Sequence, residues 1–413
     1  MSTPHTAAAP AEKAFSYLGY RFFFITVMCT SFAVQIMSVS VGWQIYDLTG
    51  NPLLLGIIGL AQFLPALLLV LVTGLVADRF SRRKIMAICL SIEFVCALSL
   101  FFLAEVHVGQ VWPIFVVLVC LGLARAFLSP ATDSLAPNLV PPPALANAIA
   151  MTSTAWQLSA IVGPVAGGLL YGVAGWLPYV VAAALVLVSI TCVLFIPKPP
   201  QRDAGQATNL ETMLGGFRYI WGEKVVLGAI SLDLFAVLLG GATALMPIFA
   251  RDILDVGPLG LGLLRAAPGI GAIAMALWLT RFPIRDRAGF ILFGFVAAFG
   301  LFTVVFGWST AAWISIPALI LMGACDMVSV VLRETLMQLW TPDELRGRVS
   351  AVNRVFIGGS NELGEFRAGT AAFFIGAQAA VVLGGVGTMI VAATWPVLFP
   401  GLARTRSIDH KMA

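Results

Sequence analysis

The stretch GLVADRFSRRK, residues 74–84, ends a long apolar run with one aspartate and then places four cations within six residues. Charged side chains are costly inside the hydrocarbon layer, so an apolar run that stops at such a cluster marks a membrane boundary. Clusters of arginine and lysine also favour the cytoplasmic side of a membrane. The stretch therefore predicts a membrane-spanning helix and the side on which that helix ends.

Composition extends this prediction to the whole chain. Hydrophobic residues make up 60% of the sequence and charged residues 11%, whereas about 25% of the residues in a soluble domain are charged. A helix needs about 20 apolar residues to cross the membrane, so a chain of this length has room for about twelve crossings. We expect an all-α membrane protein with twelve transmembrane helices in two six-helix halves related by pseudo-two-fold symmetry.

The apolar runs fall into two sets of six, separated by a Pro-rich and then amphipathic segment. Such a segment is typical of an interhelical linker that ends in a short surface helix. The expected organisation is an N-terminal tail (1–20), a six-helix bundle (21–196), a linker (197–224), a second six-helix bundle (225–399) and a C-terminal tail (400–413).

The distribution of cations predicts the orientation. With the N-terminus inside, the cytoplasmic segments receive nearly all cations outside the apolar runs, and the opposite loops receive only Arg251. This bias predicts a multi-pass protein of the bacterial inner membrane with both termini in the cytoplasm. The polar N-terminal tail lacks the pattern of a secretory signal, so the first helix is expected to act as the insertion signal.

Net charge and cysteines exclude other classes of protein. The net charge is +4, but the cations lie at the ends of apolar runs, so nucleic-acid binding is not expected. The six cysteines lie in apolar segments, without a CxxC pair or a histidine cluster. They are expected to be small buried hydrophobes, and neither a cofactor nor a metal is predicted.

The two halves resemble each other in sequence. TDSLAPNLVPPPALANAIAMT, which begins at Thr132, aligns with RETLMQLWTPDELRGRVSAVN, which begins at Arg333. The same register pairs Gly163 with Gly364. Parallel duplication of a six-helix unit is typical of alternating-access transporters.

Three motifs resemble the major facilitator superfamily over essentially the whole chain. GLVADRFSRRK resembles its loop between helices 2 and 3, LGLARAFLSPATDSL resembles the helix 4 segment with an intramembrane arginine, here Arg125, and AIVGPVAGG resembles the helix 5 signature of its antiporter branch. The layout is most similar to the bacterial efflux branch that includes enterobactin exporters and macrolide efflux proteins. This resemblance implies a central cavity lined by helices 1, 4, 7 and 10.

The loop motif and the helix 5 motif predict two structural devices. Asp78 can bind Arg82 and face a helix N-terminus, so we expect a cytoplasmic latch, which closes when the transporter opens outward, formed by Gly74, Asp78, Arg79, Arg82 and Asp133. Gly74 is expected to allow a close helix approach. The alternative is that the cations only fix topology.

The helix 5 motif predicts tight packing near the extracellular side, or a purely structural kink, at Gly163, Pro164, Gly167 and Gly168.

Intramembrane charges are candidates for function, because each is costly to bury. The candidate proton carriers are Asp233, Asp326 and Glu362. The alternative for each acid is a permanent ion pair with an arginine, for example Asp326 with Arg125. Glu93 is expected to belong to a local hydrogen-bond network. Polar and aromatic side chains that could line a substrate cavity are Arg125, Gln35, Phe32, Gln157 and Phe235.

The leading hypothesis is a proton-coupled exporter, an antiporter, of a bulky organic solute such as a drug or a siderophore. Its expected partners are that solute, protons and the lipid bilayer, and the chain is expected to be a monomer. The alternative is a transporter of lysophospholipid or another lipid, which lateral gaps between helices 2 and 11 or 5 and 8 would favour. No nucleophile elbow, phosphate loop or metal cluster is present in the sequence, so an enzyme is not predicted.

Overall fold

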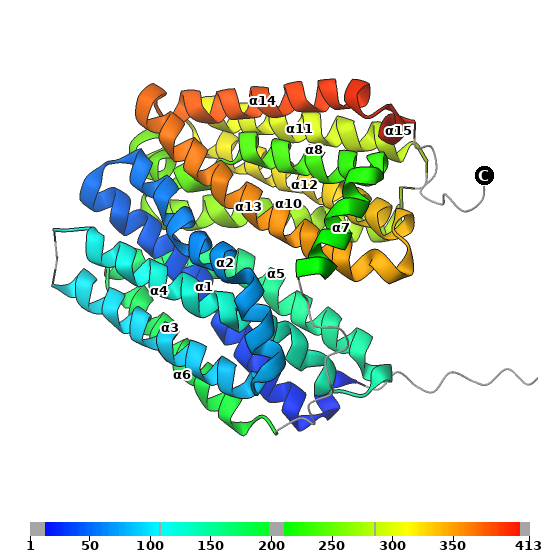
Figure 1. Cartoon of the computed structure of the whole chain (residues 1–413). Helices are drawn as coiled ribbons and strands as arrows, with labels where there is room; N and C mark the ends of the chain where they lie inside the picture. Colours follow the sequence, from blue (N-terminus) through cyan, green and yellow to red (C-terminus); the bar gives the residue numbers. More distant parts are fainter. Residues whose placement is uncertain (1–12, 107–108, 198–209, 285, 405–413) are drawn as a thin grey trace, which may run out of the picture.

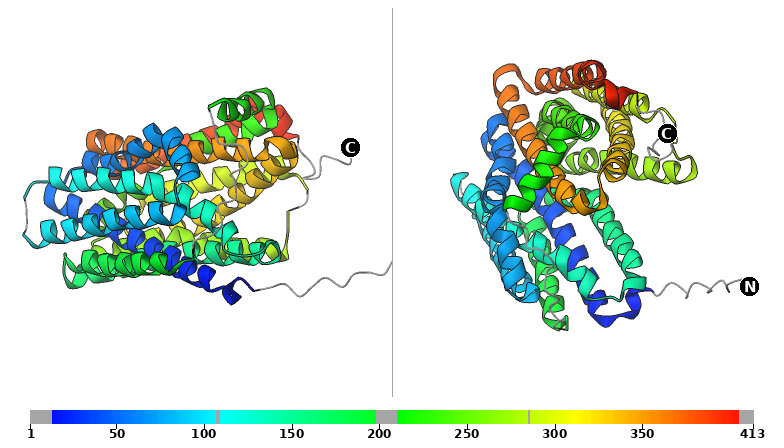
Figure 2. Two further views of the ribbon diagram at one scale, coloured as in Figure 1. Left: turned by 60° about the horizontal axis from the view of Figure 1, so that its bottom comes forward. Right: turned by 45° about the vertical axis from the view of Figure 1, so that its right-hand side comes forward.

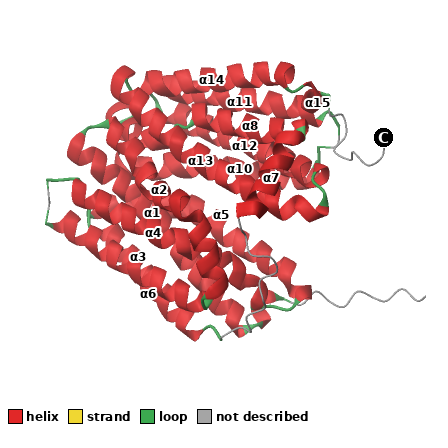
Figure 3. Ribbon diagram, viewed as in Figure 1, coloured by secondary structure: helices red, strands yellow, loops and turns green. Residues whose placement is uncertain are grey.

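The computed structural model describes residues 13–106, 109–197, 210–284 and 286–404, except for the side chains of residues 70, 71, 75, 77, 78 and 210–214. All elements in this part of the chain are helices (Figure 3). They form two bundles of six long helices each, which confirms the predicted fold class.

The first bundle holds six helices joined by short connections. Its helices are α1 (Leu18–Thr49), α2 (Pro52–Arg79), α3 (Arg82–Glu105), α4 (Trp112–Leu135), α5 (Pro142–Val173) and α6 (Leu177–Phe195). The turn between α1 and α2 follows from its residues. Gly50 takes a left-handed conformation (φ 59°) that ends α1, and the Asn51 side chain accepts a hydrogen bond from the Leu53 amide at 3.0 Å and caps α2.

The second bundle also crosses six times, but its first crossing is broken. This crossing consists of α8 (Lys224–Gly240), η3 (Thr243–Leu245), α9 (Met246–Ile248) and the π-helical η4 (Phe249–Ile253). The others are α10 (Gly257–Arg281), α11 (Ala288–Trp308), α12 (Ala312–Trp340), α13 (Asp343–Ile375) and α14 (Ala377–Leu398), followed by the short α15 (Pro400–Ala403).

Eleven helical segments in the described residues are long and apolar enough to cross a membrane. The twelfth crossing is α13, which fails this criterion because it carries many charged residues. A span with this many charges must direct them toward protein or a water-filled cavity, since lipid does not solvate them. The helix most difficult to recognise by hydropathy is therefore a candidate for function.

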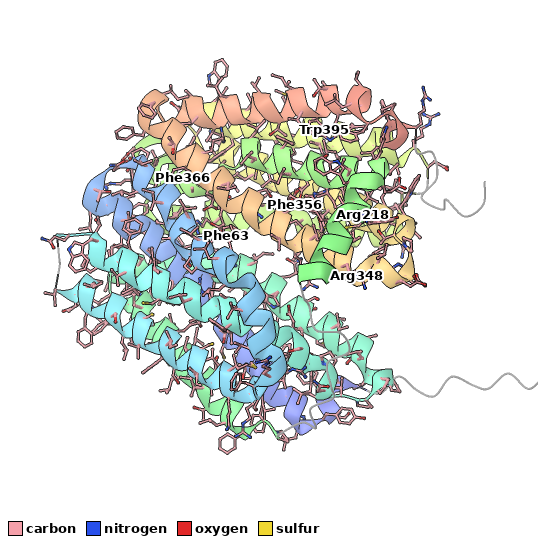
Figure 4. All side chains as sticks on the ribbon, viewed as in Figure 1. Phe63, Arg218, Arg348, Phe356, Phe366 and Trp395 are labelled. Atoms are coloured by element: carbon pink, nitrogen blue, oxygen red, sulfur yellow. The ribbon has the colours of Figure 1, made fainter. Side chains whose placement is uncertain are left out.

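Helix α7 (Leu210–Gly222) lies in the predicted linker and docks on the second bundle (Figure 1). The Tyr219 hydroxyl donates to the Trp340 carbonyl at 2.6 Å, and the Phe217 ring stacks on Phe356 of α13 with centroids 6.2 Å apart. Figure 4 labels Arg218 on α7 and Arg348 on α13, and a Cβ atom on Gly216 of α7 would lie 2.9 Å from the Arg348 backbone.

Helix α1 begins, and α15 ends, at the same end of the molecule, on the right in Figure 1. We call this the terminal end and the other the opposite end. The helices alternate in direction, so α2, α4, α6, α10, α12 and α14 run toward the terminal end (Figure 2). Two helix pairs, α2 with α13 and α5 with α10, hold the halves together. The first helix starts at Leu18, slightly before residue 21, the expected start of the bundle.

Candidate functional site

A cavity of about 410 Å³ lies inside the first bundle, between α1, α3, α4 and α5. Its wall runs from Glu93 and Arg125, near the middle of their helices, to Asp133 and Ala136 at the terminal end. Phe23 and Trp156 contribute aromatic surface. The wall is otherwise apolar, apart from seven hydroxyl side chains, those of Thr26, Thr30, Ser31, Ser129, Thr132, Thr152 and Ser153. An apolar wall with a few placed polar groups is typical of a site for an organic molecule.

A second cavity of about 430 Å³ lies between the two bundles, against α2, α4 and α13. It is lined by Gln62 and Phe63 of α2 and by Arg354 and Glu362 of α13, among others. Phe63 and Phe366 flank this seam between the halves (Figure 4). Arg125 and Ser129 line both cavities, so α4 separates them and presents the same guanidinium to each.

Arg125 is held on two sides. Its Nη1 donates to Gln62 Oε1 at 2.7 Å, and its Nε lies 3.6 Å from Oε1 of Glu93 on α3. The Glu93 side chain is fully buried, whereas 27% of the Arg125 side chain is exposed. The alternative pairing of Arg125 with Asp326 is therefore wrong, because Glu93 occupies the position of the counter-ion and Asp326 lies in the other bundle.

The acids of α13 face a second arginine. Arg265 of α10 donates from Nη1 to Ser38 Oγ of α1 at 2.8 Å, across the two halves. The charges of Glu362 and Glu365 act on Arg265, and Glu362 also interacts with Arg125. Glu93, Arg125, Glu362, Glu365 and Arg265 thus form a chain of charges across the middle of the molecule, which we call the central charge cluster.

Asp233 and Asp326 lie apart from the central charge cluster. Asp233 of α8 forms an ion pair with Arg333 of α12, and both side chains are nearly buried. Asp326 lies two turns before Arg333 on α12, and the charges of Arg333 and Asp233 act on it. Two of the three candidate proton carriers therefore share one arginine within the second bundle.

Ionic contacts close the opposite end. Arg251 Nη1 lies 3.2 Å from Asp47 Oδ1 of α1, and the Arg251 guanidinium sits 5.8 Å from the centroid of the Tyr46 ring. The Tyr46 hydroxyl donates to Asp252. These contacts, which we call the outer lock, join α1 to the π-helical turn η4.

The helix 5 motif lies next to the outer lock, at close helix crossings. A Cβ atom on Gly167 would lie 3.0 Å from the Ile36 carbonyl oxygen of α1, and one on Gly163 would lie 2.6 Å from Gln35 Cβ. On the other side, Gly168 packs directly against the backbone of α10 at Pro258, and Gly262 of α10 packs against Pro164. The motif therefore packs α5 between α1 and α10.

The expected latch residues lie at the terminal end. Asp133 Oδ2 is 3.4 Å from Arg354 Nη1 of α13, and both side chains are largely exposed. Arg79 is exposed, and Arg82 is half-buried at the start of α3. The side chain of Asp78 lies outside the described residues, so its pairing with Arg82 stays a prediction.

The expected close approach at Gly74 is wrong for this conformation. A Cβ atom at Gly74 would meet no described atom within 4 Å, because the halves are joined mainly toward the opposite end. Arg83 is one of the cations for which the alternative was a role in topology alone, but it donates to the carbonyls of Leu194 and Ile196. It thereby binds the C-terminal end of α6, where the helix dipole is negative.

Four expected cavity residues lie outside the walls of both cavities. Gln35 packs at the contact of α1 with α5, and Phe32 is half-buried beside it on α1. Gln157 is exposed on α5, next to Trp156. Phe235 packs on Trp395 of α14 with ring centroids 5.3 Å apart, because α8 faces its own bundle here. Of this set, only Arg125 lines the cavities.

The sequence pattern ranks the central residues too low. Glu93, Arg265 and Glu365 are intramembrane charges, and their burial cost alone makes them candidates. The sequence favours Asp233 and Asp326 over them, because the resemblance places the cavity on the first, fourth, seventh and tenth crossings. Glu93, Arg265 and Glu365 lie instead on the third, eighth and eleventh crossings, which are α3, α10 and α13. Within the described residues, no group of three or more metal-binding side chains is present.

Two six-helix halves, a cavity that reaches one end and an ionic closure at the other define a membrane transporter. The chain belongs to the family described as Transmembrane secretion effector, within the major facilitator superfamily, because the model of that family matches residues 8–410. It is a transporter family and not an enzyme family.

Curated relatives agree with this assignment. The chain is 26% identical over 347 residues to the enterobactin exporter EntS of Shigella boydii serotype 4 (strain Sb227), which covers 81% of this chain and 80% of the relative. It is also 26% identical over 332 residues to the enterobactin exporter EntS of Escherichia coli O127:H6. This match covers 77% of this chain and 74% of that relative.

Solved structures share the fold. A bacterial homologue of the human lysosomal transporter Spinster, in an inward-facing and unoccupied conformation, matches with a TM-score of 0.76 and 15% identity, over 96% of this chain and 99% of that one. The nucleoside transporter NupG matches with a TM-score of 0.69 and 14% identity, over 92% of this chain and 99% of that one.

Proposed function

We propose that the protein is a proton-coupled exporter of a bulky organic solute of the siderophore or drug class, and that it works by alternating access. The observation that carries this proposal is the cavity beside Arg125, which combines aromatic and hydroxyl side chains with one partly exposed guanidinium. Enterobactin exporters among the relatives support the siderophore class.

The conformation supports loading from the cytoplasm. The cavity extends to the terminal end, which positive-inside bias assigns to the cytoplasm, while the outer lock closes the opposite end. This is the state in which an exporter takes up its solute. The similar fold of a transporter solved in an inward-facing conformation agrees with this interpretation.

Charge balance supports proton coupling. The central charge cluster holds three acids and two arginines, and the separate group within the second bundle consists of Asp233, Asp326 and Arg333. Each group has one acid in excess. An uncompensated carboxylate is costly away from water, so one bound proton would neutralise each group. Glu362 is our first choice for the carrier, because it lines the cavity between the halves and faces Arg125.

The test uses inverted membrane vesicles with enterobactin as the probe. An imposed pH gradient should drive its uptake, and a protonophore should abolish that uptake. Glu362→Gln should lower gradient-driven uptake while binding of the probe is retained. Glu344→Gln, an exposed acid at the start of the same helix, is the matched control and should behave like the unmodified protein. Uptake that ignores the gradient would remove proton coupling from the proposal.

Close contact between the halves argues against the lipid alternative. A Cβ on Gly369 of α13 would lie 2.8 Å from the Gly56 Cα of α2, and one on Gly269 of α10 would lie 2.8 Å from Ile161 of α5. The predicted helices 2 and 11 correspond to α2 and α13, and the predicted helices 5 and 8 to α5 and α10. Both pairs thus touch in the half of the membrane nearer the opposite end. Lysophospholipid uptake that is independent of the pH gradient would favour the lipid transporter instead.

A further inference from the structure

The first crossing of the second bundle is interrupted, whereas its counterpart in the first bundle is not. Helix α8 ends at Gly240, and the next helical residue is Thr243 of η3. Gly241 has ψ 111°, which turns the backbone out of the helix. The counterpart, α1, runs without interruption from Leu18 to Thr49.

The interruption leaves backbone carbonyls without their helical partners. In a continuous helix, the carbonyl of Leu239 would accept a hydrogen bond from the amide four residues later, which is that of Thr243. Inside a membrane, an unpaired carbonyl costs several kcal/mol by general estimate. Here Arg367 of α13 takes the place of the missing donor, because its Nη2 donates to the Leu239 carbonyl at 2.5 Å.

Arg367 is specific to the half that contains the interruption. The internal repeat aligns GPVAGG of α5 with GEFRAG of α13, so Ala166 is the counterpart of Arg367. An arginine thus occurs where the neighbouring crossing is broken, and an alanine where it is continuous. The fit is close, since a Cβ on Gly241 would lie 3.3 Å from the Gly364 backbone of α13.

The segment beyond the interruption contacts both halves. Residues 242–253 carry Arg251 and Asp252, which form the outer lock with Tyr46 and Asp47 of α1. Phe249 of the same segment is buried and stacks on Phe306 of α11 with centroids 4.4 Å apart. The interruption therefore separates α8 from a segment that packs within the second bundle and is also tied to α1 of the first bundle by the outer lock.

We propose that Arg367 is a positioning residue of the transport cycle: by satisfying the broken end of α8, it stabilises the bent crossing and with it the closed outer lock. Straightening of the crossing would give the Leu239 carbonyl a backbone donor, and would release Arg367 while the opposite end opens. The proposal rests on alternating access, and on no particular substrate or coupling ion.

The experiment measures the opening of the opposite end directly, without a substrate. Spin labels on Leu48→Cys of α1 and Leu254→Cys beyond η4 are placed in a chain whose six native cysteines are replaced, and the distance between them is measured in detergent and in lipid nanodiscs. In Arg367→Met, which keeps an apolar stem but has no donor, the ratio of long to short distances should rise roughly fivefold to 150-fold, as expected for one lost buried hydrogen bond. Arg367→Lys, which can still donate, should stay near the unmodified ratio.

The matched control is Thr388→Val. Thr388 of α14 donates to the Ala236 carbonyl at 3.0 Å, on the same helix end but one turn before the interruption. This variant loses a hydrogen bond to a carbonyl inside the continuous part of α8, and it should leave the distance ratio unchanged. Equal shifts in Thr388→Val and Arg367→Met, or no shift in Arg367→Met, would overturn the proposal. If Arg367→Met shifts the distances but the protein exports no siderophore or drug, the proposal for Arg367 stands and only the proposed function is wrong.

Discussion

Arg125 illustrates how one residue can connect two cavities. It lines both, its charge is compensated by the buried Glu93, and its orientation is fixed by Gln62 of α2. Intramembrane position indicated from sequence that Arg125 mattered. Its partner was not predictable, because any of several acids on other helices could have met it.

The pairing of Arg125 with Glu93 leads to a stability prediction. Arg125→Gln leaves a buried carboxylate uncompensated and should lower the free energy of unfolding by about 3–5 kcal/mol. Adding Glu93→Gln should restore much of the lost free energy of unfolding, because it removes the unpaired carboxylate. Denaturation in mixed micelles measures both, and a double variant no more stable than Arg125→Gln would contradict the pairing.

The exposed ion pair of Arg354 with Asp133 provides a comparison for the buried pair of Arg125 with Glu93. Arg354 and Asp133 are 72% and 64% exposed, and surface ion pairs contribute about 0–1 kcal/mol. Arg354→Gln should therefore have little effect on stability. A large loss of stability in this variant would mean that the terminal end is closed more tightly than this conformation indicates.

At the scale of elements, small residues determine which helices touch. The string GPVAGG indicated close packing from the sequence, but its two partners, α1 and α10, come from different halves and required the tertiary structure. Its counterpart GEFRAG retains a glycine, Gly364, which contacts α8. Charged residues stand at two positions where GPVAGG has proline and alanine. Those residues are Glu365 of the central charge cluster and Arg367 at the broken end of α8.

Helix α5 carries a matched pair of glycines for a test of packing. Gly168→Ala should force α5 away from Pro258 of α10 and destabilise the protein by about 1–3 kcal/mol. Gly172→Ala, one turn further on, meets no described atom within 4 Å and should change stability by less than about 0.5 kcal/mol. Equal effects of the two changes, in thermal unfolding or in transport, would contradict the role of the crossing.

At the scale of the whole molecule, the two halves are joined at one end and hold cavities toward the other. Helix pairs α2 with α13 and α5 with α10, together with the outer lock, make the opposite end the closed one. From the positive-inside bias of the sequence we expect the terminal end to face the cytoplasm. These two observations combine into the expectation of an inward-facing transporter.

Orientation can be measured with two exposed glycines. Gly109 lies in the loop between α3 and α4, at the opposite end, and Gly222 ends α7 at the terminal end. In a cysteine-free background and intact cells, Gly109→Cys should react with a membrane-impermeant maleimide. Gly222→Cys should react only after permeabilisation. The reverse pattern would refute the orientation with both termini in the cytoplasm.

The sequence by itself determined what depends on local composition. Apolar runs of spanning length, cations at their ends and an internal repeat predicted twelve helices, two halves and an expected orientation, because the membrane restricts each segment independently of its neighbours. Only the tertiary structure decided which charges meet. Glu93 lies beside Arg125, Asp233 beside Arg333 and Arg367 at the broken end of α8, because pairing across helices depends on their rotation and register, which no single segment encodes.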